Sequence, residues 1–250
     1  MKIVTFSFDD GETYDEKLCE MFRRYGLRAS FGLRSNYFGK HGDLYREDGQ
    51  FYRSYETIRK EDVSRIYRGF EICSHGANHR SFDKLTWEEL EEEIGSDQKI
   101  LKELTGQEII GAIYPGGNFN DLCIKNLKKL GIRFCRTCDD GTYPTGIPKE
   151  WLAWVPTCHF KDSNLPDLIN SFTNDTEEEV KILHVFGHSY ELEFKDRDWW
   201  GYMEDICRAV RGIPGAKFLT LGETFLLLNR SQTLAGERIN NEYSGNNNGQ

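Results

Sequence analysis

The stretch KIVTFSFDDGETYDEKLCEMFRRYGLRASFGLR, residues 2–34, decides the fold because a helix pattern separates two strand patterns in it. The first strand candidate, KIVTFSF, runs directly into Asp9 and Asp10. Leu18 and Phe22 then lie one helical turn apart, and RASFGLR follows as the second strand candidate. A strand, a helix and a strand in this order predict a βαβ unit with parallel strands.

The same alternation continues along the chain. Further strand candidates are FEICS, IIGAIYP, IRFCRTC, LAWVPTCHF, KILHVFG and AKFLTL, and helix patterns lie between most of them. Thr86 and Glu89 form a capping-box pattern at the start of the longest helix. The tyrosine- and glycine-rich segment from Ser35 to Thr57 is interpreted as a long loop. About seven to eight mostly parallel strands predict a closed or nearly closed α/β barrel, with an open doubly wound sheet as the alternative.

Length and composition indicate one soluble domain. The chain has 250 residues, of which residues 1–229 are assigned to a barrel domain and the Asn- and Gly-rich residues 230–250 to a disordered tail. Mean hydropathy is -0.63, and no apolar run approaches the ~20 residues that span a bilayer. A net charge of -9 without a basic patch excludes nucleic acid as a partner.

The N-terminus and the cysteines bear on the compartment. MKIVTFSFDD has no long apolar core of a signal peptide, so a cytoplasmic protein without membrane contact is expected. The seven cysteines are scattered and are expected to be reduced thiols. The oligomeric state does not follow from the sequence.

Two acids and two histidines lie at predicted strand ends, where parallel α/β folds place their chemistry. Asp9 and Asp10 follow KIVTFSF, and His75 follows FEICS. If the chain turns helical after Ser74, His75 and His79 lie one turn apart on one face. A carboxylate from a neighbouring strand end would complete a three-ligand metal site, which is the pattern of a catalytic zinc centre.

Each of these motifs alone has an ordinary structural explanation. A surface turn often carries an HxxxH pair, and Asp-Asp-Gly is common as a helix N-cap and turn. Both motifs at strand ends of one β/α fold favour the metal site. The adjacent acids also suggest a division of labour, in which one binds the metal and the other remains as a base for a water molecule.

FSFDDG (residues 6–11) and EICSHGANHRSFDKLTWEELEEEI (residues 71–94) resemble the first two motifs of the polysaccharide deacetylases, the NodB-homology group of carbohydrate esterase family 4. The resemblance implies a distorted β/α barrel that holds Zn²⁺, with Co²⁺, Mn²⁺ or Ni²⁺ as alternatives. It also implies hydrolysis of an N-acetyl or O-acetyl group on a small-molecule or oligosaccharide substrate. By the family pattern the general base is Asp9, and the metal ligands are Asp10, His75 and His79.

The third family motif normally reads like RPPYG and aligns here with IYPGG, residues 113–117. Gly116 stands at the tyrosine position and can still donate its backbone N–H to an oxyanion. The arginine that normally supports the base is absent. Arg136, near the end of IRFCRTC, is a candidate replacement, and a plain structural arginine is the alternative.

The last family motif supplies a histidine acid, for which KILHVFGHSYE offers His184 and His188. Both lie on one face of a strand. His188 is nearer the carboxyl end and is the predicted acid, whereas His184 is predicted to be a buried support group. The fourth motif, with its Asp and Trp, has no clear counterpart. Trp154, Tyr190 and Trp199 are candidate platforms for a sugar ring, with core packing as the alternative.

Two other functions remain open. The altered third motif is compatible with a catalytically inactive sugar-binding homologue, although a binding protein has no need for both a base and an acid. An amidohydrolase of the same fold that acts on a small non-sugar amide is the other possibility, because polymeric cell-wall substrates lie outside the cell.

Overall fold

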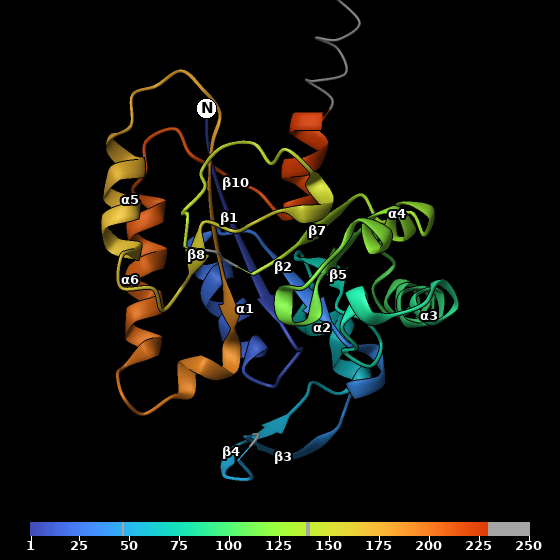
Figure 1. The fold of residues 1–250 in the computed structure, drawn as a ribbon. Coiled ribbons are helices and arrows are strands. Elements are labelled where there is room, and N and C mark those ends of the chain that lie inside the picture. Colours follow the sequence, from blue (N-terminus) through green and yellow to red (C-terminus); the bar gives the residue numbers. More distant parts are fainter. Residues whose placement is uncertain (47, 139–140, 230–250) are drawn as a thin grey trace, which may run out of the picture.

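The computed structural model describes residues 1–46, 48–138 and 141–229, which fold around one curved sheet (Figure 1). The described residues give this sheet eight strands in the order β7-β6-β5-β2-β1-β9-β8, with β10 beside the first half of β1. All pairs within it are parallel. The strands are β1 (Lys2–Asp9), β2 (Ala29–Leu33), β5 (Glu71–Ser74), β6 (Gly111–Ile113), β7 (Phe134–Arg136), β8 (Cys158–His159), β9 (Lys181–His188) and β10 (Lys217–Phe218).

One short segment nearly closes the sheet into a barrel. Trp154 forms a parallel bridge with Arg136 of β7, and four residues later Cys158 pairs with Val185 of β9. The same stretch of chain therefore pairs with β7, at one end of the strand order, and forms β8, at the other end. The predicted α/β barrel is confirmed, and it is distorted because regular pairing does not continue from β7 to β8.

Helices cover the outside of the sheet (Figure 1). Thr86 and Glu89 form the predicted capping box at the start of α3. Among the described residues, no helix is both long enough and apolar enough to cross a membrane. The helices are α1 (Asp15–Tyr25), α2 (Val63–Ile66), α3 (Trp87–Thr105), α4 (Asp121–Lys129), α5 (Leu165–Asn174), α6 (Trp199–Arg211) and a last helix over residues 221–229.

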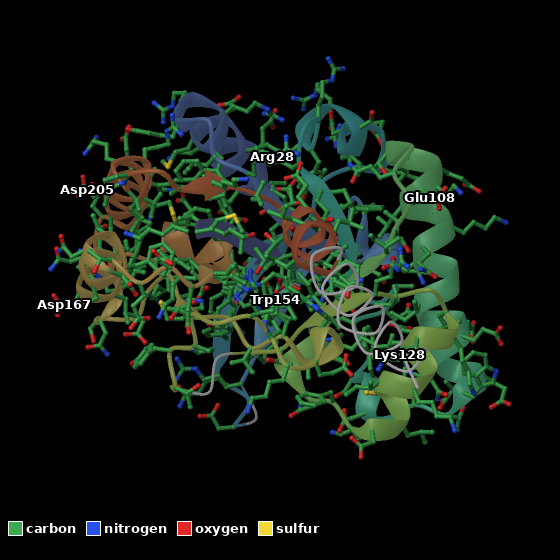
Figure 2. The ribbon with its side chains drawn as sticks, turned by 90° about the horizontal axis from the view of Figure 1, so that it is seen from above. Arg28, Glu108, Lys128, Trp154, Asp167 and Asp205 are labelled. Carbon is green, nitrogen blue, oxygen red and sulfur yellow. The ribbon has the colours of Figure 1, made fainter. Side chains whose placement is uncertain are left out.

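Alternation along β1 separates the outer core from the interior of the barrel. Phe6 and Phe8 pack in the larger hydrophobic cluster, together with residues of the outer helices. Burial of each such ring stabilises the fold by about 1.5–3 kcal/mol. Ile3 belongs to an inner cluster with Trp154, which lies near the middle of the molecule in the view of Figure 2. Because side chains alternate, Asp9 shares the inward face with Ile3.

The interpretation of residues 35–57 as a loop is wrong. They contain an antiparallel hairpin, β3 (His41–Tyr45) and β4 (Phe51–Glu56), that projects from the body of the protein (Figure 1). Both strands are largely exposed, and Tyr45 is 62% exposed. A ribbon outside the core needs no alternating apolar face, so the segment lacks the pattern that identifies buried strands. The tail predicted over residues 230–250 lies outside the described residues.

Candidate active site

Asp9 and Asp10 leave the sheet at the carboxyl end of β1. Asp9 pairs in register with Gly32 of β2 and with His188 of β9. Asp10 turns the chain with a φ of 81°, a left-handed conformation that is uncommon outside glycine. Its N–H donates to the Gly32 carbonyl at 3.0 Å, and the Arg34 guanidinium donates to the Asp10 carbonyl at 3.2 Å. These two hydrogen bonds to the Asp10 backbone fix the turn that separates the two carboxylates.

The helical turn predicted after Ser74 is wrong. Residues 75–80 form a loop in which Gly76 and His79 have φ values of 73° and 59°. Left-handed residues of this kind interrupt a right-handed helix. The imidazoles of His75 and His79 nevertheless meet, with ring centroids 4.6 Å apart. Their pairing therefore depends on the shape of the loop and not on helical spacing.

Hydrogen bonding sets the tautomer of His75. Its Nδ1 lies 2.9 Å from the carbonyl oxygen of Ile113, so Nδ1 carries the proton and Nε2 presents a lone pair. That Nε2 is 3.7 Å from Asp10 Oδ1, and Nε2 of His79 is 3.7 Å from the same oxygen. Burial lowers the pKa of His75 to about 4 and also lowers the pKa of His79. Both rings are therefore neutral near pH 7.

Asp10, His75 and His79 form a set of ligands that fits a divalent cation. One ligand atom from each lies within 4.8 Å of the others. Asp10 Oδ1 is buried and has no hydrogen-bond partner among the described residues. Burial would raise the pKa of Asp10, but Arg34 and the nearby histidines outweigh it and lower this pKa to about 2. An ionised carboxylate with two neutral imidazoles is a donor set that suits Zn²⁺ and similar transition metals.

Asp9 has a different partner. Its Oδ2 forms an ion pair with Arg136, which is fully buried on β7. Burial would raise the pKa of Asp9, but Arg136 and the neighbouring histidines outweigh it, so this pKa is lowered. Asp9 Oδ1 remains without a hydrogen-bond partner among the described residues. The structure thus brings Arg136 to Asp9 from another strand, and its support of a catalytic base stays a prediction.

We expect Arg136→Met to lower the free energy of unfolding by about 3–5 kcal/mol, because Asp9 would remain as an unpaired buried charge. Urea denaturation measures this loss. Adding Asp9→Asn to the same chain should recover part of the stability, since a neutral amide needs no counter-charge. An equal loss with and without Asp9→Asn would contradict the ion-pair explanation.

His188 faces Asp9 at the end of β9. Its Nε2 lies 3.8 Å from Asp9 Oδ2, and its Nδ1 lies 3.2 Å from Glu191 Oε2. The same oxygen accepts a hydrogen bond at 2.8 Å from Nε2 of His159, whose Nδ1 accepts from a backbone N–H. Burial would lower the pKa of His188, but Glu191, Asp10 and Asp9 outweigh it and raise this pKa to about 9. His188 is therefore protonated near pH 7.

His184 lies deeper in the barrel, on the same face of β9. It is 1% exposed, and its Nε2 is 2.9 Å from Ser7 Oγ. Its ring packs edge-to-face against Trp154, with centroids 5.0 Å apart. Burial lowers its pKa well below the usual value. This neutral histidine thus occupies the buried position predicted for it.

Gly116 lies in the 3₁₀ turn η4 (Pro115–Gly117), which is separated from the end of β6 by one residue, Tyr114. The carbonyl of Ile113, the last residue of β6, holds His75, so this turn begins beside the ligand set. A Cβ added to Gly116 would meet nothing nearer than Asn118 Nδ2 at 3.7 Å. A side chain at this position would therefore meet little else, and the role of the Gly116 N–H as an oxyanion donor stays a prediction.

Two of the three candidate aromatic platforms are wrong. Trp154 is 2% exposed and Trp199 is 7% exposed, and both pack in the hydrophobic core. Neither ring has a free face for a sugar. Tyr190 is half-buried, lies 5.1 Å from the His188 ring and stacks on the Arg53 guanidinium at 3.4 Å. It remains a candidate beside the site.

Two charged residues of the site were not predicted from the sequence. Arg34 directly follows β2 and contacts Asp10, and Glu191 stands three residues after His188. Arg34 is the last residue of the strand candidate RASFGLR and Glu191 lies four residues beyond KILHVFG, and these positions near strand ends are the signal by which both could be found. Their partners depend on side-chain directions in loops, which the sequence pattern does not specify.

The fold is that of the family 4 carbohydrate esterases. The Xyl-CE4 domain of a xylanase from the hindgut metagenome of Trinervitermes trinervoides is 15% identical, with a TM-score of 0.56 and coverage of 91% of each chain. A family 4 carbohydrate esterase from Bacillus anthracis is 18% identical, with a TM-score of 0.56, covering 89% of this chain and 81% of that one. A family 4 acetyl xylan esterase from Clostridium thermocellum, in complex with a cobalt ion, is 13% identical, with a TM-score of 0.53 and coverage of 90% and 91%.

Sequence comparison identifies the family. Residues 1–135, more than half of the chain, match the family model described as polysaccharide deacetylase. The chain therefore belongs to the polysaccharide deacetylase family. No protein among curated sequences matches it. In two of the other matching structures, the chain spans only 55% and 44% of the length of the matched chain.

Proposed function

We propose that the protein is a metal-dependent hydrolase that removes acetyl groups from an N-acetylated or O-acetylated sugar. The observation that carries this proposal is the pair of Asp9 and His188, 3.8 Å apart, beside the ligand set Asp10, His75 and His79. One member of the pair is ionised and the other is protonated, as a general base and a general acid must be. The Clostridium thermocellum esterase of similar fold is in complex with a cobalt ion, which supports a divalent metal in the proposed reaction.

Each residue of the site has a separate role in the proposed reaction. A divalent cation held by Asp10, His75 and His79 would supply Lewis acidity toward the acetyl carbonyl and a lowered pKa for water. Asp9 accepts a proton from the attacking water through Oδ1, the oxygen that Arg136 leaves open. The N–H of Gly116 donates to the oxyanion. The products are acetate and a free amine or alcohol.

His188 supplies the last proton. Its Nε2 donates to the departing nitrogen or oxygen while Glu191 holds Nδ1. An amide needs this step most, because an amide anion does not leave. His188 takes no part in the set of Asp10, His75 and His79 but belongs to a second group of possible ligands with His159 and Glu191, so the acid and the three proposed ligands can be tested separately.

The experiment that tests the function measures metal content and acetate release. Purified protein is subjected to elemental analysis and then assayed on a panel of N-acetyl and O-acetyl sugars, with and without a chelator. Chelator-sensitive acetate release is the expected result. Turnover of small cyclic amides but not of acetylated sugars would favour the small-amide hydrolase, and bound sugar without turnover would favour the inactive binding protein.

Glu191→Gln should change the pH dependence of the reaction. Burial lowers the pKa of His188, and Glu191 is the first of the groups that outweigh it and raise that pKa from 6.5 to about 9. Because the acid must be protonated, activity should fall as the pH rises through this pKa. Removing the Glu191 charge should shift the fall to lower pH, which a pH–rate profile measures. An unchanged alkaline limb would show that Glu191 does not tune the acid.

A further inference from the structure

The loop that carries His75 and His79 is hydrogen-bonded to helix α3. Strand β5 ends at Ser74, and three N–H groups of the following loop, those of Ala77, Asn78 and Arg80, donate to Glu93 of that helix. Asn78 N–H and Arg80 N–H both donate to Glu93 Oε1, at 2.7 and 3.2 Å. The Asn78 side-chain amide donates to Glu93 Oε2 at 3.0 Å. Ala77 N–H donates to the backbone carbonyl of Glu93 at 3.0 Å.

The approach of Glu93 requires a glycine in the loop. A Cβ on Gly76 would lie 2.7 Å from Glu93 Oε1 and 2.9 Å from Phe82, both too close for a real contact. Gly76 also has a φ of 73°, which disfavours any other residue. A glycine next to His75 is therefore needed to make room for the Glu93 carboxylate.

Glu93 is 1% exposed, and the donors that reach it are neutral. The nearby Arg80 guanidinium instead pairs with Glu89 at 2.6 Å. A buried carboxylate of this kind is retained only if its oxygens accept hydrogen bonds, and here backbone and side-chain amides of the loop supply them. The contact is thus mutual, because the loop supplies hydrogen-bond donors to the Glu93 oxygens and Glu93 supplies acceptors to the loop.

One turn further along α3, Asp97 holds the start of the same loop. Asp97 is fully buried, and its Oδ2 accepts from Ser74 Oγ at 2.5 Å. That hydroxyl in turn accepts from Gly76 N–H at 3.2 Å. The other oxygen, Oδ1, accepts from Ser35 N–H at 2.8 Å. Both ends of the His75–His79 loop are therefore tied to one face of α3.

We propose that Glu93 is a positioning residue that orders residues 76–80 before the metal binds, and that it acts as a hydrogen-bond acceptor and not through its charge. The proposal rests on the metal site of the proposed function. A ligand loop that is already ordered loses less conformational freedom on binding, so the site binds the cation more tightly. Loss of a partner outside the ligand set typically weakens metal affinity by about 10–100-fold.

The test compares Glu93→Ala with Glu93→Gln in the full-length protein. Hydrogen exchange of amides 76–80 in the metal-free protein reports the order of the loop, and competition with a chromophoric chelator reports the affinity for Zn²⁺. Glu93→Ala should lose amide protection and bind Zn²⁺ about 10–100-fold more weakly. Glu93→Gln should keep most of both properties, because its amide oxygen can accept the same two backbone N–H groups and only the hydrogen bond from the Asn78 side chain is lost.

Glu91→Gln is the matched control, since Glu91 is an exposed acid on the same helix. Gly76→Ala disturbs the same contact from the loop side and serves if Glu93→Ala does not fold; it should lose protection and affinity as well. Unchanged protection in Glu93→Ala, or a loss in Glu93→Gln as large as in Glu93→Ala, would overturn the proposal. If the unaltered chain binds none of Zn²⁺, Co²⁺, Mn²⁺ and Ni²⁺ while loop exchange still depends on Glu93, the proposed function is overturned and the ordering role is supported.

Discussion

His75→Ala should lower the affinity for Zn²⁺ by more than about 100-fold, the upper end of what loss of a residue outside the ligand set costs. The carbonyl of Ile113 holds Nδ1 of His75, so that Nε2 faces Asp10. In the variant, no other group takes the place of this nitrogen as a ligand. His79→Ala and Asp10→Ala should have similar effects. Elemental analysis of the dialysed proteins and chelator competition measure the loss.

The matched variant is Asp9→Asn. Asp9 is the sequence neighbour of Asp10, yet its ion pair is with Arg136 and its Oδ2 lies 3.8 Å from His188 Nε2, and it is not one of the three residues of the ligand set. Asparagine keeps an oxygen for Arg136 but leaves this buried cation without a counter-charge, so the variant should be less stable than the unaltered protein yet retain metal while losing turnover. Metal loss in Asp9→Asn equal to that in Asp10→Ala would reverse the assignment of the two acids.

The regular part of the fold follows from the sequence because its physical causes are local. In β1, every residue from Ile3 to Asp9 is buried, since both faces of the strand are covered, and the acids come where the strand ends. The hairpin of β3 and β4 has no such cause. Tyr45 and Phe51 pair at its tip without a buried face to select them, so its strands could not be distinguished from a loop.

The site is only partly predictable for a related reason. His75 and His79 follow from the motif, but the assumed helix does not exist, and the two rings meet because Gly76 and His79 adopt left-handed conformations. Such conformations depend on tertiary contacts, here those with Glu93. The register that sets His188 opposite Asp9 is likewise a property of two strands far apart in the chain.

His188→Ala should reduce turnover by about 10²–10⁴-fold, the usual contribution of a general acid, while metal content stays unchanged. Metal at Asp10, His75 and His79 is retained because His188 lies outside this set; His188 belongs to a second group of possible ligands, with His159 and Glu191, in which both rings hydrogen-bond to Glu191 Oε2. The loss should be largest for amide substrates and smaller for activated esters, whose leaving groups need no proton. Parallel rate measurements on an N-acetyl sugar and on an activated acetyl ester test this dependence.

His184→Ala separates the two histidines of β9. His184 bonds Ser7 inside the barrel and makes no contact with Asp9, so its loss should leave the ratio of amide to ester rates unchanged. It should instead lower the free energy of unfolding by roughly 1–3 kcal/mol, because it leaves a cavity against Trp154 and an unpaired Ser7 hydroxyl. If His184→Ala showed the leaving-group-dependent rate loss and His188→Ala did not, the proton donor would be the deeper histidine. The carboxyl end of β9 would then not be the place where the leaving group departs.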